Sequence, residues 1–269
     1  MVNMAITLIS EVTINPPESY DFRSTQVDVF GTVWGGHKAI IDPLQTGENN
    51  VPNGGLIKNM ISGQAGASAF GSISSIQANK GFLTVGSTNT SVKLPPVFNW
   101  FNLSSSDSVA LSAWMTRKSA GLFLSTVFCS CHQTGANHHY SFQQKANGRF
   151  AFAVGTQTVE LAENDVPLNT PFLVSIYLKN TGANKWTAYC YINKTLKATI
   201  QRDGAWTNPT LGNGNWIGPI IGCNNSTGFS GTPVDAVVHR IQSLLVNANA
   251  FDAEGWISEE VDLNFARFQ

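Results

Sequence analysis

Short segments in which apolar and polar residues alternate follow one another along most of this chain of 269 residues. In Ser108–Thr116, for example, the apolar residues Val109, Leu111, Ala113 and Met115 occupy every second position. This period of two places them on one face of a β-strand. Such segments recur about every ten residues, a spacing typical of antiparallel sandwiches and barrels. The sequence therefore predicts an all-β protein built as an antiparallel β-sandwich.

Turn residues separate the other segments of this kind. Asn147-Gly148 favours a tight hairpin, because both residues accept a positive φ at little cost. Two helices are expected, one over Gly55–Ser62 and one that begins near Asp252 or Ser258, since both residues are good N-caps. The other predicted strands are Gln26–Trp34, Leu122–Cys129, His139–Gln144, Arg149–Val154, Thr156–Leu161, Phe172–Leu178, Trp186–Ile192, Thr195–Gln201, Ile217–Gly222 and Val234–Val246.

The charge and composition of the chain exclude several classes of partner. Only 12% of the residues are charged and the net charge is −1, so no basic field is present for nucleic acid or an anionic membrane. No apolar run approaches the roughly 18 residues of a membrane span, and the first residues lack the features of a secretion signal. Four cysteines are too few for a disulfide framework and indicate folding in a reducing cytosol. Cys190 is expected to be a small buried apolar residue.

Several weak motifs come in an order that resembles a known family. Ser91–Pro95 and Val109–Arg117 look like its opening strands, Tyr191–Lys194 like its hairpin turn, Val234–Val246 like its long late strand and Asp252–Val261 like its ending. This order resembles the concanavalin-A-like, laminin-G-like jelly roll, of the kind found in bacteriophage tail, fibre or capsid-decoration proteins. The resemblance implies a jelly roll that holds a glycan or another protein. Lys194 and Ala236 stand where glycine is common in the family.

The resemblance divides the chain in two. Residues 80–269 are predicted to form the jelly-roll domain, and residues 1–79 a short N-terminal strand or anchor segment. The alternation at the start of the chain, Val2–Leu8, suits a strand that pairs with a neighbouring subunit, and it equally suits an edge strand of the same sandwich. Gly63–Gly71 is rich in small residues and is expected to be a packed loop.

Aromatic and amide side chains in the glycine-rich loops are the candidate glycan-binding residues. Aromatic rings stack on sugars, and amides bond to hydroxyl groups. The same rings could instead belong to the core or to a subunit contact, where aromatic residues are also enriched. The candidates are Trp206, Asn208, Asn213, Asn215, Trp216 and Phe229.

Carboxylates do not form a catalytic pattern in this sequence. Glycanases with this fold place their acidic residues on one face of one strand. The offset from Glu160 to Glu163 is odd, which breaks that geometry, and Asp165 lies in a predicted turn. Glu259 and Glu260 are adjacent and are expected at a solvated helix end. No catalytic residue is therefore predicted.

Two groups of residues are possible metal ligands. A hairpin could bring thiols and imidazoles together for zinc, but the usual spacing of paired cysteines is absent, and two buried thiols beside a polar loop are preferred. Calcium at the rim of the sandwich is the other candidate, although a self-stabilised Gly/Asn loop is preferred. No cofactor is therefore predicted. The residues concerned are Cys129, Cys131, His132, His138 and His139 for zinc, and Asn224, Asn225 and Asp235 for calcium.

Three functions follow, in order of preference. The first is a non-enzymatic structural or adhesion protein of a bacteriophage virion, made in the host cytoplasm and assembled as a homo-oligomer, with a trimer favoured. Its partners would be other virion proteins or a host surface glycan. The second is a stand-alone lectin-like module that binds carbohydrate. The third is a glycoside hydrolase.

Overall fold

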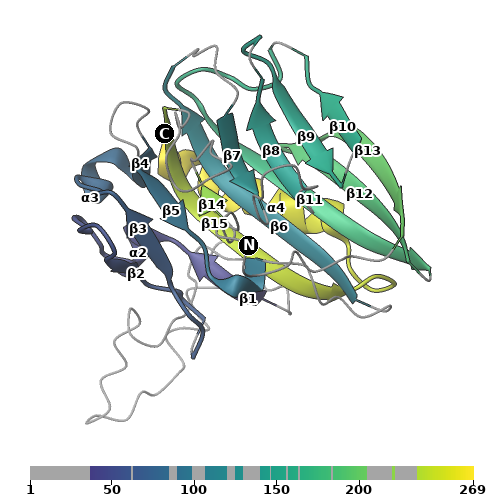
Figure 1. The fold of residues 1–269 in the computed structure, drawn as a ribbon, viewed down its shortest axis with the longest axis horizontal. Coiled ribbons are helices and arrows are strands. Elements are labelled where there is room, and N and C mark those ends of the chain that lie inside the picture. The colour runs from purple at the N-terminus through teal and green to yellow at the C-terminus, as the bar shows by residue number, and fades with distance from the viewer. Residues whose placement is uncertain are drawn as a thin grey trace, which may run out of the picture.

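The structure, a computed structural model, describes residues 37–61, 63–84, 90–98, 107–119, 125–129, 140–145, 147–155, 157–162, 164–182, 184–204, 220–221 and 235–269. Strands dominate these residues (Figure 1). The elements are β1 (His37–Ile41), α2 (Pro43–Thr46), β2 (Leu56–Ile57), β3 (Ala67–Phe70), α3 (Ile76–Asn79), β4 (Phe82–Thr84), β5 (Ser91–Lys93), the 3-10 helix η2 (Pro96–Phe98), β6 (Asp107–Arg117), β7 (Ser125–Cys129), β8 (Tyr140–Gln144), β9 (Phe150–Val154), β10 (Gln157–Glu160), β11 (Pro171–Gly182), β12 (Lys185–Ile192), β13 (Thr195–Asp203), β14 (Ile220–Ile221), β15 (Ala236–Asn247) and α4 (Ala253–Phe268).

The described strands form two antiparallel sheets. The seven-stranded sheet I has the order β1-β15-β6-β11-β12-β13, and β4 pairs with β15. The eight-stranded sheet II has the order β10-β9-β8-β7-β14-β5-β3-β2. The two sheets pack face to face, so the molecule is a two-layer antiparallel β-sandwich, as the alternating pattern predicts.

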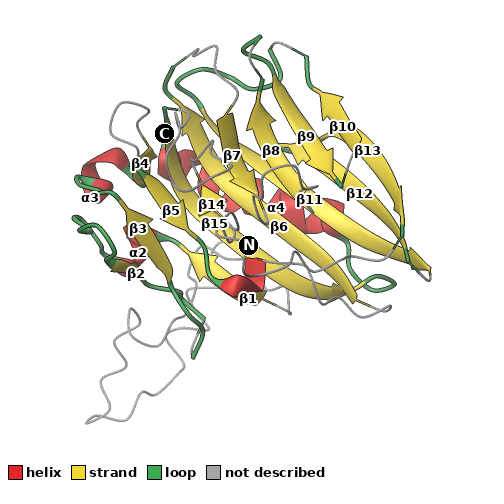
Figure 2. Cartoon of the chain, in the orientation of Figure 1, coloured by secondary structure: helices red, strands yellow, loops and turns green. Residues whose placement is uncertain are grey.

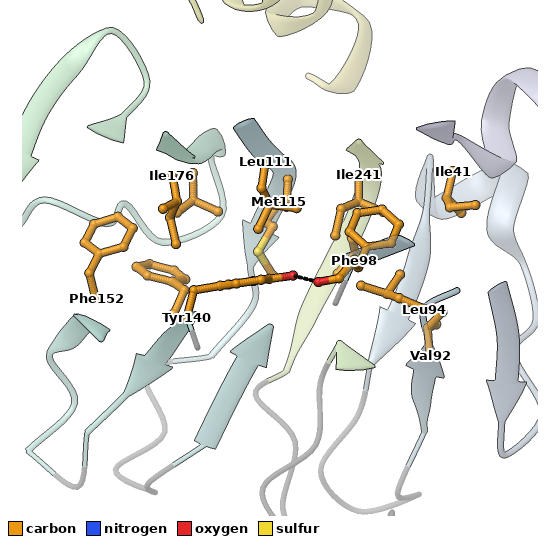
Figure 3. Packing of buried hydrophobic residues seen from close by; sticks show 14 of the residues in the cluster. Ile41, Val92, Leu94, Phe98, Leu111, Met115, Tyr140, Phe152, Ile176 and Ile241 are labelled. Atoms are coloured by element: carbon orange, nitrogen blue, oxygen red, sulfur yellow. Dashed lines mark hydrogen bonds between the residues drawn. The ribbon is translucent and has the colours of Figure 1, made fainter. Parts of the chain in front are cut away.

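The main core fills the space between the two sheets (Figure 3). Leu111 and Met115 of β6 and Ile176 of β11 face residues of sheet II such as Phe152. Tyr140 of β8 crosses this core, and its hydroxyl donates a hydrogen bond of 3.0 Å to the carbonyl oxygen of Phe98. The bond satisfies a polar group that would otherwise be costly to bury.

Helix α4 covers the outer face of sheet I and adds a third layer (Figure 2). The side chain of Asp252 caps its first turn by accepting a 3.0 Å hydrogen bond from the N–H of Gly255. Trp256 and Ile257 then pack on Trp114 and Leu173 of the sheet. Strand β6 is consequently buried on both faces over most of its length.

Most predicted strands are confirmed where the chain is described. The segments Ser108–Thr116, Phe172–Leu178, Trp186–Ile192 and Thr195–Gln201 correspond to β6, β11, β12 and β13. The hairpin at Asn147-Gly148 joins β8 to β9, and Gly148 has a φ of 80°. Cys190 is buried in the core as predicted, and its burial raises the pKa of its thiol. The predicted helix start at Asp252 is also confirmed.

Two local predictions were wrong. The expected helix Gly55–Ser62 is not found over its described residues 55–61: Leu56–Ile57 is the edge strand β2, paired with β3. The expected loop Gly63–Gly71 contains β3 itself, which pairs with β5. Strands this short have too few residues for their alternation to be told from a helical pattern or a loop.

The boundary expected at residue 79 does not separate the described strands. β1 pairs with β15 of sheet I, and β2 and β3 belong to sheet II. The strands β1, β2 and β3 are thus parts of the sandwich. The predicted strand at the start of the chain and the predicted strand Gln26–Trp34 lie outside the described residues.

Candidate functional site

A pocket of about 450 Å³ opens at one end of sheet I, between the ends of α3 and α4. This volume lies within the usual range for small-ligand sites, about 300–1,000 Å³. Five separate stretches of chain contribute to it. The lining residues are Ala78, Asn79, Lys80, Thr116, Lys118, Asn169, Thr170, Pro171, His239, Phe268 and Gln269.

A β-bulge directs His239 into this pocket. The register of β15 against β6 shifts between Val238 and Arg240, so His239 is the extra residue. Bulges of this kind re-aim a side chain and often occur beside functional sites. Gly81 permits the turn after α3 to approach closely, because a Cβ at this position would lie 2.4 Å from the carbonyl oxygen of Val238.

The hydrogen bonds of His239 determine its tautomer. Its Nδ1 lies 2.7 Å from the carbonyl oxygen of Lys80, which can only accept, so Nδ1 carries the proton. Nε2 then accepts from the hydroxyl of Thr116 at 2.8 Å. Burial lowers the pKa of His239 to about 4, so the ring is neutral at physiological pH. The ring also stacks on Phe268, with centroids 4.7 Å apart, and the two rings form the floor of the pocket.

Polar side chains from the strand ends surround this floor. Asn169 has a φ of 56°, and its N–H donates to the carbonyl oxygen of Arg117 at 2.8 Å, which holds the loop before β11 against the end of β6. Lys118 is held by its own N–H, which donates to the carbonyl oxygen of Asp235 at 2.7 Å. The ammonium group of Lys80 donates to the main-chain oxygen of Gln269. Amides and ammonium groups thus converge on one opening.

Among the residues that the structure describes, the lining contains no aspartate or glutamate. Its polar groups are amides, hydroxyls and two ammonium groups, which can bond to a polar or anionic ligand. A glycosidase of the usual type needs two carboxyl groups that flank the scissile bond, and no Asp or Glu side chain is among the described residues that line this pocket. The arrangement is suited to binding.

A buried ionic network that includes two carboxylates lies under α4. Arg240 donates to Glu260 at 3.0 Å and to Asp42 at 3.2 Å, and Arg267 makes two bonds to Asp42 at 2.7 and 2.8 Å. Glu260 also accepts from Trp114 at 3.1 Å. The expectation that Glu260 lies at a solvated helix end was therefore wrong, because this residue is on the face of α4 that packs on the sheet.

The other predicted acidic residues do not gather at a site. Glu160 is exposed on the edge strand β10, with Arg149 at 4.0 Å. Asp165 lies in a turn, as predicted, and pairs with Lys197 at 2.6 Å. Glu163 lies outside the described residues.

The predicted glycan-binding residues Trp206, Asn208, Asn213, Asn215, Trp216 and Phe229 all lie outside the described residues. The same holds for Asn224 and Asn225, and for Cys131, His132, His138 and His139. Asp235 precedes β15, and Cys129 is the last residue of β7. Within the part of the chain that is described, no three His, Cys, Asp or Glu residues are grouped to hold a metal ion. The glycan, zinc and calcium hypotheses stay predictions.

Sequence reasoning did not find the pocket residues Lys80, Lys118, Asn169 and His239. One signal was available: His239, Arg240, Gln242 and Ser243 interrupt the apolar residues of a long strand, and buried polar groups need partners. The other residues carry no signal, because only the packing of distant segments brings them together.

Comparisons with known proteins bear on the fold. No family model and no curated protein sequence matches this chain. A structure of Trypanosoma rangeli sialidase with 2,3-difluorosialic acid is similar, with a TM-score of 0.56 and 11% identity over 87% of this chain. The same sialidase with sialic acid gives a TM-score of 0.54 and 12% identity. The chain spans about a third of that sialidase, 34% of its length. At this identity the likeness shows the fold alone.

A carbohydrate-binding module of a sialidase, the Ruminococcus gnavus IT-sialidase CBM40 bound to α2,3-sialyllactose, has a TM-score of 0.41 and 12% identity. The match covers 57% of this chain and 82% of the module's chain.

None of the helices in the described part of the chain is long and apolar enough to span a membrane.

Proposed function

We propose that this chain is a non-catalytic carbohydrate-binding β-sandwich that holds a sugar in the pocket between α3 and α4. The observation that carries the proposal is the lining of the pocket, where amide, hydroxyl and ammonium groups surround the stacked rings of His239 and Phe268, and the described residues include no aspartate or glutamate. Sugars offer many hydroxyl groups and C–H faces, which such a lining matches.

The fold is consistent with this proposal. Most of the chain matches part of a sialidase whose structures contain sialic acid or its difluoro derivative, both sugars. The concanavalin-A-like jelly roll, which the order of the sequence motifs suggests, is the finer form of this fold that we propose. A virion location, a trimeric assembly and an anchoring role for the N-terminal segment stay predictions from the sequence.

A direct test is to titrate the purified chain with a panel of neutral and acidic oligosaccharides by calorimetry. Saturable binding is expected, and it should fall in the variant Asn169→Gly, because glycine keeps the positive φ of this position and removes only the amide. Thr195→Ala, an exposed position on β13, is the matched control.

Two results would redirect the proposal. If Trp206→Ala or Trp216→Ala abolishes binding while Asn169→Gly leaves it unchanged, the sugar binds at the loop aromatics and not in this pocket. If the chain releases reducing sugar and Glu160→Gln prevents the release, the chain is a glycoside hydrolase.

A further inference from the structure

The charged side chains that line the pocket are both cationic. They are Lys80 and Lys118, and the described residues of the lining include no aspartate or glutamate. The buried Asp42 is the acidic residue whose field reaches His239, and two arginines already neutralise it. Lys80 uses one of its three N–H groups on Gln269, whereas Lys118 is exposed at the rim.

The fields of both lysines reach the floor of the pocket. Burial is the main cause of the lowered pKa of His239, and its bond to the Lys80 carbonyl opposes the shift. The charges of Lys118 and of Lys80 lower the pKa of His239 further, because both ammonium groups disfavour a positive charge on the His239 ring. A cationic ligand would meet the same repulsion, and an anionic one would be attracted.

We propose that the ligand of this pocket is a sugar that carries a negatively charged substituent, a carboxylate or a sulfate, and that Lys118, assisted by Lys80, binds this group. The inference rests on the proposed function and adds the chemical class of the ligand. The amides of Asn79 and Asn169 are placed to bond to the hydroxyl groups of the same sugar.

The test compares matched sugars that differ only in charge. Affinities for galacturonate and galactose oligomers, and for sulfated and unsulfated galactose oligomers, are measured by calorimetry at about 20 mM and about 200 mM NaCl. The carboxylate pair and the sulfate pair distinguish the two possible anionic groups. An acidic sugar should bind more tightly than its neutral counterpart, and the added salt should weaken its binding.

The variant Lys118→Gln should weaken binding of the acidic sugar by about two- to fivefold, the scale of an exposed ion pair, and leave neutral sugars unaffected. Lys118→Glu should abolish the preference for acidic sugars. Lys185→Gln is the matched control, because this lysine is exposed and lies far from the pocket. Lys185 pairs with Gly182 at one end of β11, whereas the pocket residue Pro171 is at the other end. At about 3.3 Å per residue, the two ends of the strand are about 35 Å apart.

The outcomes separate the two proposals. Equal affinity for neutral and acidic sugars, with no effect of Lys118→Gln, would overturn the inference and leave carbohydrate binding intact. Lys118-dependent binding of acetate or sulfate alone, with no gain from an attached sugar, would overturn carbohydrate binding and keep the anion site. No binding of any of these probes would overturn both.

Discussion

Two charged regions lie side by side on the outer face of sheet I, and they begin at consecutive residues of β15. Arg240 extends under α4 into a buried network in which Asp42 and Glu260 balance the arginines. His239 faces a pocket lined by Lys80, which donates to the main-chain oxygen of Gln269, and by the exposed Lys118. The buried charges hold α4 in place, whereas we propose that Lys118 is available for a ligand.

The difference follows from burial. The side chains of Arg240, Asp42 and Glu260 are 0% exposed, and a charge in such a place is tolerated only when it is paired and hydrogen-bonded. Lys118 is exposed, so water solvates its charge until a ligand replaces that water. Predictions on the two regions should therefore separate stability from binding.

The largest effect is expected for Arg240→Met. The substitution leaves Glu260 buried without its cation, and such a loss typically destabilises a protein by about 3–5 kcal/mol. Urea denaturation of both proteins measures this change. Lys194→Met, which removes a surface pair with Asp262 at 2.6 Å, is the control and should change stability by less than about 1 kcal/mol. If Arg240→Met loses no more stability than the control Lys194→Met, the network contributes little to holding α4.

A pH effect of similar size is expected from His239. Its pKa is about 4 in the folded state, below the ordinary value of 6.5 for an exposed ring, so the unfolded state binds a proton more readily between these two pH values. The neutral ring makes its full contribution to the free energy of unfolding above about pH 6.5. This contribution, about 3 kcal/mol, is lost as the pH falls through 4.

The measurement is the free energy of unfolding from about pH 7 to about pH 4 in the wild type and in His239→Asn. Asparagine keeps a donor for the Lys80 carbonyl and does not titrate, so its profile should be flatter by that amount. The carboxylates titrate in both proteins, and the difference between the two profiles therefore isolates His239. Parallel profiles would show that His239 is not buried as a neutral ring.

A smaller effect is expected for Gly81→Ala, which links the two regions. The added Cβ would lie 2.4 Å from the Val238 carbonyl oxygen, so the turn that carries Lys80 must move away from the bulge. Forced contacts of this kind cost about 1–3 kcal/mol. Thermal unfolding should show this loss, and sugar affinity should fall with it, because Lys80 and His239 are displaced. Unchanged stability and affinity would mean that the bulge does not depend on this close approach.

The smallest change in stability is expected for Lys118→Gln, although its effect on binding is the most informative. An exposed side chain outside the core usually alters stability by no more than about 0.5 kcal/mol. Thermal unfolding should therefore match the wild type, while calorimetry with an acidic sugar shows the weaker binding proposed above. A large loss of stability in Lys118→Gln would mean that Lys118 supports the fold, as the buried network under α4 does.

The sandwich could be predicted from the sequence because its signal is local. In β6 and β11, side chains at every second position face the core, and this alternation is visible in any stretch of about eight residues. The prediction failed at β2 and β3, whose two and four residues are too short for a period to be recognised. It also failed for Glu260, because nothing in the helix itself indicates that this carboxylate meets Arg240 and Trp114 of the sheet.

The sequence by itself determined the β-sandwich class, most of its strands, the capped start of α4 at Asp252 and the buried state of Cys190, since each depends on residues within one short segment. Only the tertiary structure decided that α4 covers sheet I and that a pocket opens beside it. Lys80, Lys118, Asn169 and His239 lie far apart in the chain, and only the packing of α3, α4 and the strand ends brings them together. Which of two neighbouring charges is neutralised and which remains available is therefore a property of the packed fold.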